Sequence, residues 1–202
     1  MVPTPSYSSM IDELAKREEC NPSIPITVGI ILANAHTQFC HDHILQFLPE
    51  YNRTVGKLLN FYMPGYYIDD ECKTPVFSLK GDNYNFEQSD FFHSRDILNK
   101  LGIPLSESPQ LILVEYHNHK LRFHSKKTII INLERAFYSG QDICTIFEQL
   151  VKISRKTAEY SMFRERYLRQ KKGASFIHFI KKEMPSLFLS QLVSEISKIF
   201  TV

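Results

Sequence analysis

Possible redox chemistry in this chain centres on Cys40, a cysteine placed between a hydrophobic run and a helix-like stretch. A cysteine at a helix N-terminus faces unpaired backbone N–H groups and the positive end of the helix dipole, and both stabilise a thiolate. Such a thiolate forms a mixed disulfide with glutathione or oxidises to a sulfenic acid. Cys40 is therefore a candidate catalytic nucleophile, with Thr37 and His43 as its assisting groups.

The same segment holds side chains that suit zinc, namely His36, Cys40, His41, Asp42 and His43. Neighbouring residues at the start of a helix point in different directions. No Cys-x-x-Cys or His-x-x-x-His pair marks a closed tetrahedral site. We therefore predict solvated polar residues here, with no metal site and no cofactor.

Two elements are expected to position Cys40. Residues 24–32 (IPITVGIIL) form an apolar run typical of a buried strand. Residues 44–57 carry apolar side chains at three- and four-residue spacing, which predicts a helix with one face on a sheet. Pro49 lies inside this helix and predicts a kink or a break close before it.

Further elements follow from the same periodicity and turn signals. They are a helix over 9–20 capped by Ser8 or Ser9, a strand over 58–68, an irregular polar stretch over 69–85, a helix over 90–101 closed by Gly102, a hairpin of strands 110–116 and 121–123, a strand within 127–133, and a long helix from 141 to about 172.

The order of these elements over residues 25–155 resembles the thioredoxin fold. Cys40 falls where that family places the first cysteine of its active-site helix, and Ser108-Pro109 falls where the family has a cis-proline loop before a strand. The resemblance implies an α/β domain with a mixed sheet flanked by helices. It also implies a groove near Cys40 and Pro109 that docks an extended peptide, with Phe39, Ser108 and Pro109 as binding residues.

The chain departs from the family at the motif itself, because His43 stands where the second cysteine of Cys-x-x-Cys belongs. Dithiol exchange therefore cannot run through this motif. The Thr37-x-x-Cys40 pattern is similar to the peroxidatic element of peroxiredoxins, although Ala33 replaces the proline expected before it. A monothiol redox protein or peroxidase that uses Cys40 is thus the alternative to a binding protein.

A basic segment follows the predicted domain. Residues 152–182 contain ten Lys or Arg and two Glu, with aromatic residues interleaved. This composition fits an acidic protein partner or, as a second alternative, nucleic acid, whereas the simplest interpretation is a solvated face. The candidate binding residues are Arg164, Arg166, Arg169, Lys171 and Lys172.

Residues 176–200 hold more apolar side chains than two short helices can hide from each other. This block is expected to pack on the domain or to form an interface with a partner or with a second copy of the chain. The two possibilities cannot be separated from the sequence.

Composition places the chain among ordinary folded proteins. Of its 202 residues, 43% are hydrophobic and 23% charged, which argues against disorder. The first twenty residues lack the apolar run of a signal peptide, and no segment approaches the roughly 18 apolar residues of a membrane span. We therefore expect a cytoplasmic protein without membrane association, in which the four widely spaced cysteines are free thiols.

Together these features predict three regions: an N-terminal helical extension (1–24), a thioredoxin-like domain (25–155) and a C-terminal helical extension (156–202). The expected function is a non-enzymatic protein-binding or assembly module. Its binding surfaces would be the Cys40/Pro109 groove or the C-terminal apolar helices.

Overall fold

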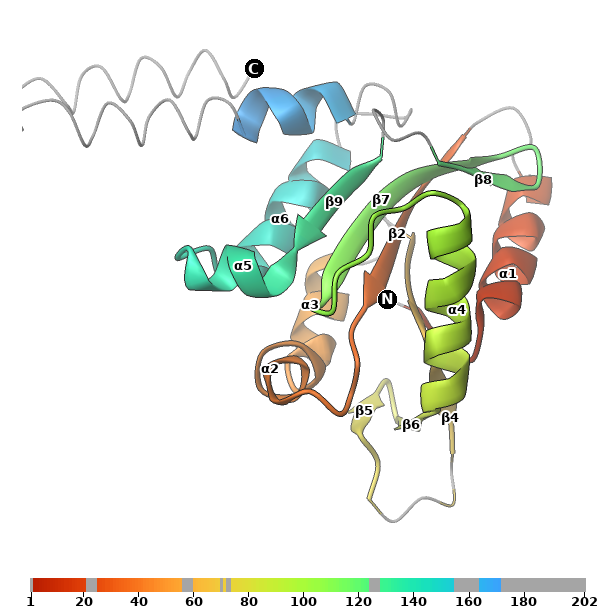
Figure 1. Cartoon of the computed structure of the whole chain (residues 1–202), viewed down its shortest axis with the longest axis vertical. Coiled ribbons are helices and arrows are strands. Elements are labelled where there is room, and N and C mark those ends of the chain that lie inside the picture. Colours follow the sequence, from red (N-terminus) through yellow and green to blue (C-terminus); the bar gives the residue numbers. More distant parts are fainter. Residues whose placement is uncertain are drawn as a thin grey trace, which may run out of the picture. The chain divides into compact units, whose positions relative to one another are not determined.

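The computed structural model describes residues 2–20, 25–55, 60–69, 71, 74–123, 128–154 and 164–171. The chain divides into two compact units, residues 1–160 and 161–202. In the second unit, residues 164–171 form a helix. All other elements belong to the first unit (Figure 1).

The first unit is built on a six-stranded mixed sheet. Its strands are β1 (Val2–Thr4), β3 (Asn60–Pro64), β2 (Ile26–Leu32) and β7 (Gln110–His117) in spatial order, with β8 (Lys120–Arg122) and β9 (Ile129–Asn132) both paired to β7. The pairs β1–β3 and β3–β2 are parallel, whereas β7 is antiparallel to β2, β8 and β9. Because β8 pairs with the end of β7 and β9 with its beginning, these two short strands share one edge of β7.

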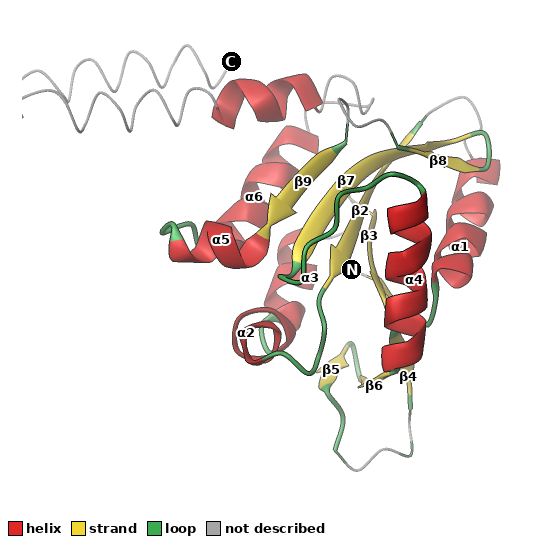
Figure 2. Ribbon diagram, viewed as in Figure 1, coloured by secondary structure: helices red, strands yellow, loops and turns green. Residues whose placement is uncertain are grey.

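Helices cover both faces of this sheet (Figure 2). On one face lie α1 (Tyr7–Cys20) and α4 (Gln88–Lys100), and on the other lie α3 (Leu48–Val55), α5 (Leu133–Tyr138) and α6 (Ile143–Ser154). Alternating residues of β2 and β7 enter the core with α1 and α4, as the period of two in a strand requires. This core cluster includes Met10, Leu14, Val28, Ile30, Leu32, Phe91, Leu98, Ile112 and Val114.

The expected N-terminal extension is part of this body. Strand β1 pairs with β3, and Met10 and Leu14 of α1 are buried against the sheet. Helix α1 begins at Tyr7, earlier than predicted, because the Ser6 hydroxyl, rather than Ser8 or Ser9, accepts from the Ser9 N–H at 3.3 Å.

A close approach between β2 and β3 depends on Gly29. Gly29 lies opposite Phe61 in the parallel pair, and a Cβ at position 29 would lie 2.3 Å from Phe61 Cδ1. The absence of a side chain lets the Phe61 ring lie across β2 and meet Phe147 of α6 in a T-shaped contact, with 5.3 Å between ring centroids.

A second, three-stranded sheet corrects two predictions, the single strand over 58–68 and the irregular stretch over 69–85. Its order is β4 (Tyr66–Ile68), β6 (Asp82–Phe86) and β5 (Phe77–Leu79), all antiparallel. Gly65 ends β3 with φ of +91°, a conformation that glycine adopts without strain, and this turn starts β4. Lys80 and Gly81, both with positive φ, form the tight turn between β5 and β6.

The helical segment after β2 is interrupted, as Pro49 predicts. A short helix α2 (Gln38–Cys40) continues as a π-helical turn η1 (His41–Leu45), residues 46 and 47 form a turn, and α3 begins at Leu48. Pro49 therefore lies in the first turn of α3, where its missing N–H costs no hydrogen bond.

Several other predictions hold. The hairpin forms as β7 and β8, and both residues of its turn, Asn118 and His119, have positive φ. Helix α4 is followed by Gly102 with φ of +85°. Of the predicted long helix over 141–172, the structure describes α6 and, in the second unit, the helix over 164–171; residues 155–163 and 172 lie outside the described residues, so a single continuous helix stays a prediction. The apolar block 176–200 also lies outside them.

Candidate functional site

The loop between β2 and α2 is closed by its own hydrogen bonds. The Thr37 hydroxyl donates to the Asn34 carbonyl at 2.9 Å, and the Asn34 side chain accepts from the His36 N–H at 2.9 Å. Below the loop, the buried Tyr66 hydroxyl donates to the Ala33 carbonyl at 2.6 Å, which fixes the end of β2. The segment before Cys40 is therefore held by hydrogen bonds within the loop and by one hydrogen bond from β4.

The Cys40 side chain points into the protein interior and is 1% exposed. Helix α2 begins at Gln38, before Cys40, so Cys40 is the third helical residue and not the first. Burial raises the pKa of the Cys40 thiol, and this outweighs the effects of the Thr37 side chain and the Asn34 backbone, which lower it. The charge of Glu134 raises the pKa further. Burial therefore outweighs the expected stabilisation of a thiolate, and the thiol is neutral near pH 7.

The proline loop is tied to the start of α5. The Ser108 hydroxyl donates to Glu134 Oε2 at 2.6 Å, and the Pro109 carbonyl accepts from the Leu133 N–H at 2.9 Å. Pro109 is buried, and no cis peptide bond occurs among the described residues. Glu134 thus links the two predicted anchors of the groove, because it accepts from Ser108 and its charge acts on Cys40. Cys40 is therefore buried in the core, and the Ser108-Pro109 loop is hydrogen-bonded to α5.

His43 faces a different environment, an aromatic cluster that we define as Phe39, His43, Phe137 and Tyr138. The His43 ring lies 4.3 Å from the Phe137 ring and 4.9 Å from the Phe39 ring, between centroids. Tyr138 contacts both Phe39 and Phe137 and is 73% exposed. The cluster joins the helix after β2 to α5 and presents aromatic surface to solvent.

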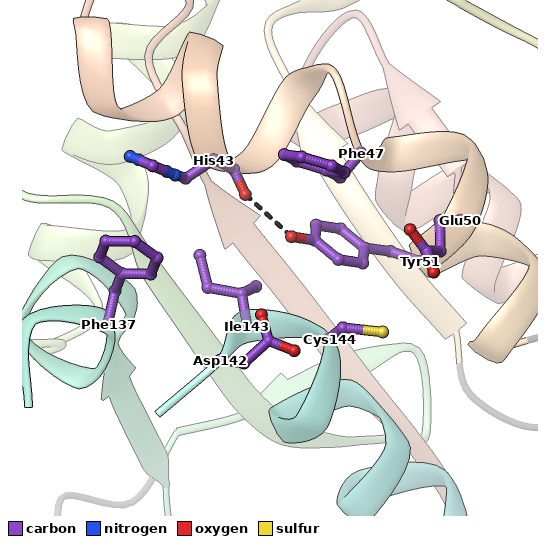
Figure 3. Close-up of a pocket in the computed structure, with 8 residues that line it drawn as sticks. All are labelled: His43, Phe47, Glu50, Tyr51, Phe137, Asp142, Ile143 and Cys144. Atoms are coloured by element: carbon purple, nitrogen blue, oxygen red, sulfur yellow. Dashed lines mark hydrogen bonds between the residues drawn. The ribbon is translucent and has the colours of Figure 1, made fainter. Parts of the chain in front are cut away.

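A pocket of about 320 Å³ adjoins the aromatic cluster (Figure 3). We call it the α3–α6 pocket, because its walls come from η1 and α3 on one side and from the end of α5 and the start of α6 on the other. Its lining residues are His43, Phe47, Glu50, Tyr51, Phe137, Asp142, Ile143 and Cys144.

Tyr51 supports this pocket from within. Its hydroxyl donates to the His43 carbonyl at 2.9 Å, which ties α3 to η1 (Figure 3). Burial raises the pKa of Tyr51, and the charges of Asp142, Cys144 and Glu50 raise it further. The phenol therefore remains a neutral donor, and its ring packs on Phe147 with 5.0 Å between centroids.

Two carboxylates, Glu50 and Asp142, lie at the exposed side of the pocket. Asp142 also caps α6, because its Oδ2 accepts from the Thr145 N–H at 3.3 Å and from the Thr145 hydroxyl at 3.4 Å. In the part of the chain that the structure describes, neither carboxylate forms an ion pair with a Lys or Arg side chain. The pocket thus combines aromatic walls with negative charge.

The remaining predicted residues belong to other segments of the chain. Arg164, Arg166, Arg169 and Lys171 lie on the helix of the second unit, and Lys172 lies outside the described residues. His41 and Asp42 form an exposed pair, with Nδ1 and Oδ1 3.0 Å apart. Across the described ranges, no three His, Cys, Asp or Glu side chains converge as metal ligands.

His117 and His119 of the β7–β8 hairpin take part in a structural contact that the sequence did not predict. The buried Glu18 carboxylate accepts from the backbone N–H groups of Asn118 at 2.6 Å and His119 at 2.9 Å. The rings of His117 and His119 lie 3.6 Å and 3.3 Å from the same carboxylate. Glu18 therefore fixes the β7–β8 turn against α1.

Sequence reasoning identified Phe39 and His43 but missed Phe137, Tyr51 and Asp142. A signal existed for Asp142, because an aspartate directly before an apolar helical run is typical of an N-cap. No local pattern indicates that this cap lies beside α3, since the contact joins residues about ninety positions apart.

Comparison with known protein families, with curated proteins and with solved structures found no match to this chain. Among the described residues, no helix has the length and apolar character of a membrane span. The function must therefore be argued from the geometry of the site.

Proposed function

We propose that this chain is a thioredoxin-like, non-enzymatic binding module that docks a segment of a partner protein. The thioredoxin-like class is supported by a parallel β–α–β half joined to an antiparallel half, with helices on both faces of the sheet. It is also supported by Cys40 in the first turn of the helix that follows β2, and by Pro109 directly before β7.

The observation that carries the proposal is the exposed aromatic cluster beside a pocket. Tyr138 is 73% exposed and Phe47, at the pocket, is 41% exposed. Aromatic side chains dominate the energetics of protein interfaces, since they bury a large area with few rotatable bonds. The rings of the cluster contact one another across α2, η1 and α5, and such packing lowers the ordering cost of binding a partner.

The Cys40 thiol that a redox activity would use is turned inward in this fold. Cys40 is 1% exposed, and the Ser108 hydroxyl and the Pro109 carbonyl bond to α5. We therefore place the binding surface at the aromatic cluster and the α3–α6 pocket, next to the groove that the sequence predicts.

The test is selection of binders from a random linear peptide library displayed on phage, followed by NMR mapping of the enriched peptide on the full chain. We expect the resonances of Phe39, His43, Phe137 and Tyr138 to shift on titration. Phe137→Ala should weaken binding by at least about tenfold, as expected for an interface anchor.

Phe92→Ala is the matched control, because Phe92 is 40% exposed but lies on α4, on the opposite face of the sheet. It should leave affinity unchanged. Failure to enrich any peptide, or shifts confined to the α4 face, would contradict the proposal.

The second candidate remains a monothiol redox protein or peroxidase that uses Cys40. One observation favours it, because the neighbouring Thr37 side chain lowers the pKa of the thiol. The larger effect of burial opposes it. The reactivity of Cys40, considered in the Discussion, separates the two candidates.

A further inference from the structure

The α3–α6 pocket has a lining that distinguishes between possible ligands. Its interior is apolar and aromatic, with the buried Ile143 at its base and the rings of Phe47, Tyr51 and Phe137 around it (Figure 3). Its volume of about 320 Å³ lies at the small end of the range for ligand sites, roughly 300 to 1,000 Å³. The pocket is therefore of a size to receive one side chain or a group of similar size.

The charge of the pocket is negative. Glu50 and Asp142 both lie near Tyr51, since the charges of both raise its pKa. Within the described residues, no Lys or Arg of the chain pairs with them. A ligand that brings a positive charge would therefore form an ion pair with these exposed carboxylates.

The geometry of acceptors and rings favours a guanidinium group over an ammonium group. The hydrogen bonds of Asp142 to Thr145 use Oδ2, so Oδ1 can accept from a ligand. A guanidinium is planar, stacks on aromatic faces and donates a forked pair of hydrogen bonds to a carboxylate. Its weaker hydration makes entry into an aromatic pocket less costly than for lysine.

We infer that the α3–α6 pocket binds an arginine side chain of the docked partner segment, with Asp142 and Glu50 as its charge partners and Phe47 and Phe137 as stacking surfaces. This inference rests on the proposed function, because the arginine belongs to the segment that the aromatic cluster binds. It adds a specificity: the partner presents an arginine next to residues that contact the cluster.

The first test uses N-acetyl-arginine amide and its neutral, nearly isosteric citrulline analogue, titrated into the full chain by NMR at low ionic strength. The arginine derivative should shift the resonances of Phe47, Phe137 and Ile143. It should bind about fivefold more tightly than the citrulline derivative, and the lysine derivative should fall between them. Equal affinity for arginine and citrulline would overturn the inference.

The second test removes the charges while keeping the shape. Asp142→Asn retains an N-cap residue for α6, and Glu50→Gln is nearly isosteric. Each should weaken the arginine derivative about threefold and leave the citrulline derivative unchanged. Asp96→Asn, an exposed change on α4, is the control and should have no effect. If both pocket variants bind arginine like the unchanged chain, the inference is wrong.

The two proposals can fail separately. A selected peptide that requires Phe137 but tolerates replacement of its own arginine by alanine would overturn the arginine specificity and leave the binding function intact. Conversely, if no peptide is selected at the cluster while the derivatives discriminate as expected, the pocket preference stands and the partner-binding function is wrong.

Discussion

Cys40 and His43 lie three residues apart on one short helical segment, yet the protein uses them in opposite ways. The Cys40 side chain is 1% exposed, and this burial raises the pKa of its thiol. The His43 ring lies in the aromatic cluster and lines the α3–α6 pocket. Cys40, the more reactive side chain, is buried, whereas His43, which suits binding contacts, lies at the pocket. This difference argues for binding at a surface rather than chemistry at a thiol.

The largest expected effect concerns thiol reactivity, with Cys20 as the internal reference. Cys20 ends α1 and is exposed, whereas Cys40 is buried. In single-cysteine variants, alkylation at pH 7.5 should be at least about 100-fold slower at Cys40, because both thiolate fraction and access are reduced. The rate of iodoacetamide labelling, followed by mass spectrometry, measures this.

Labelling of Cys40 at a rate close to that of Cys20 would remove the contrast between Cys40 and His43 and would favour the monothiol alternative. Labelling of both thiols in urea is the control, since the two rates should converge when the chain unfolds.

A smaller effect is expected in the pH dependence of stability. The raised pKa of Cys40 means that the unfolded chain ionises this thiol first, from about pH 9 upward. The stabilisation is therefore complete below pH 9 and is lost as pH rises through the folded-state pKa. The free energy of unfolding should fall by up to about 1.4 kcal/mol per pH unit from this group alone.

Urea denaturation of the unchanged chain and of Cys40→Ala between pH 8 and pH 10 measures this slope, and Cys20→Ala is the matched control. Several tyrosines with raised pKa, including Tyr66, steepen the slope in all three proteins, so the difference between proteins isolates the thiol. Identical slopes for the unchanged chain and Cys40→Ala would mean that the thiol is not held neutral by the fold.

The sequence predicted those parts of the fold that depend on local pattern. The apolar runs of β2 and β7, the β7–β8 hairpin and the break before α3 follow from hydrophobic alternation, turn residues and Pro49. The three-stranded sheet was missed, because one glycine turn at Gly65 separates two strands that read as one aromatic run.

The candidate site was only half predictable for a physical reason. Phe39 and His43 belong to the Cys40 segment, but Phe137 and Asp142 come from a distant part of the sequence and lie beside them only in the tertiary fold. The burial of Cys40 is likewise a tertiary effect, since a cysteine in the first turn of a helix looks the same in sequence whether it faces solvent or core.

The most direct test of the account compares two variants against one selected peptide. Isothermal titration calorimetry of the peptide with Cys40→Ser and with Phe137→Ala separates contact from chemistry, after far-UV circular dichroism has verified that both variants fold; Cys40→Ala substitutes if the serine variant does not. We predict that the Cys40 variant binds within about twofold of the unchanged chain, and that Phe137→Ala binds at least about tenfold more weakly. Loss of binding in the Cys40 variant, with binding retained in Phe137→Ala, would contradict the account and would indicate a mixed disulfide at Cys40.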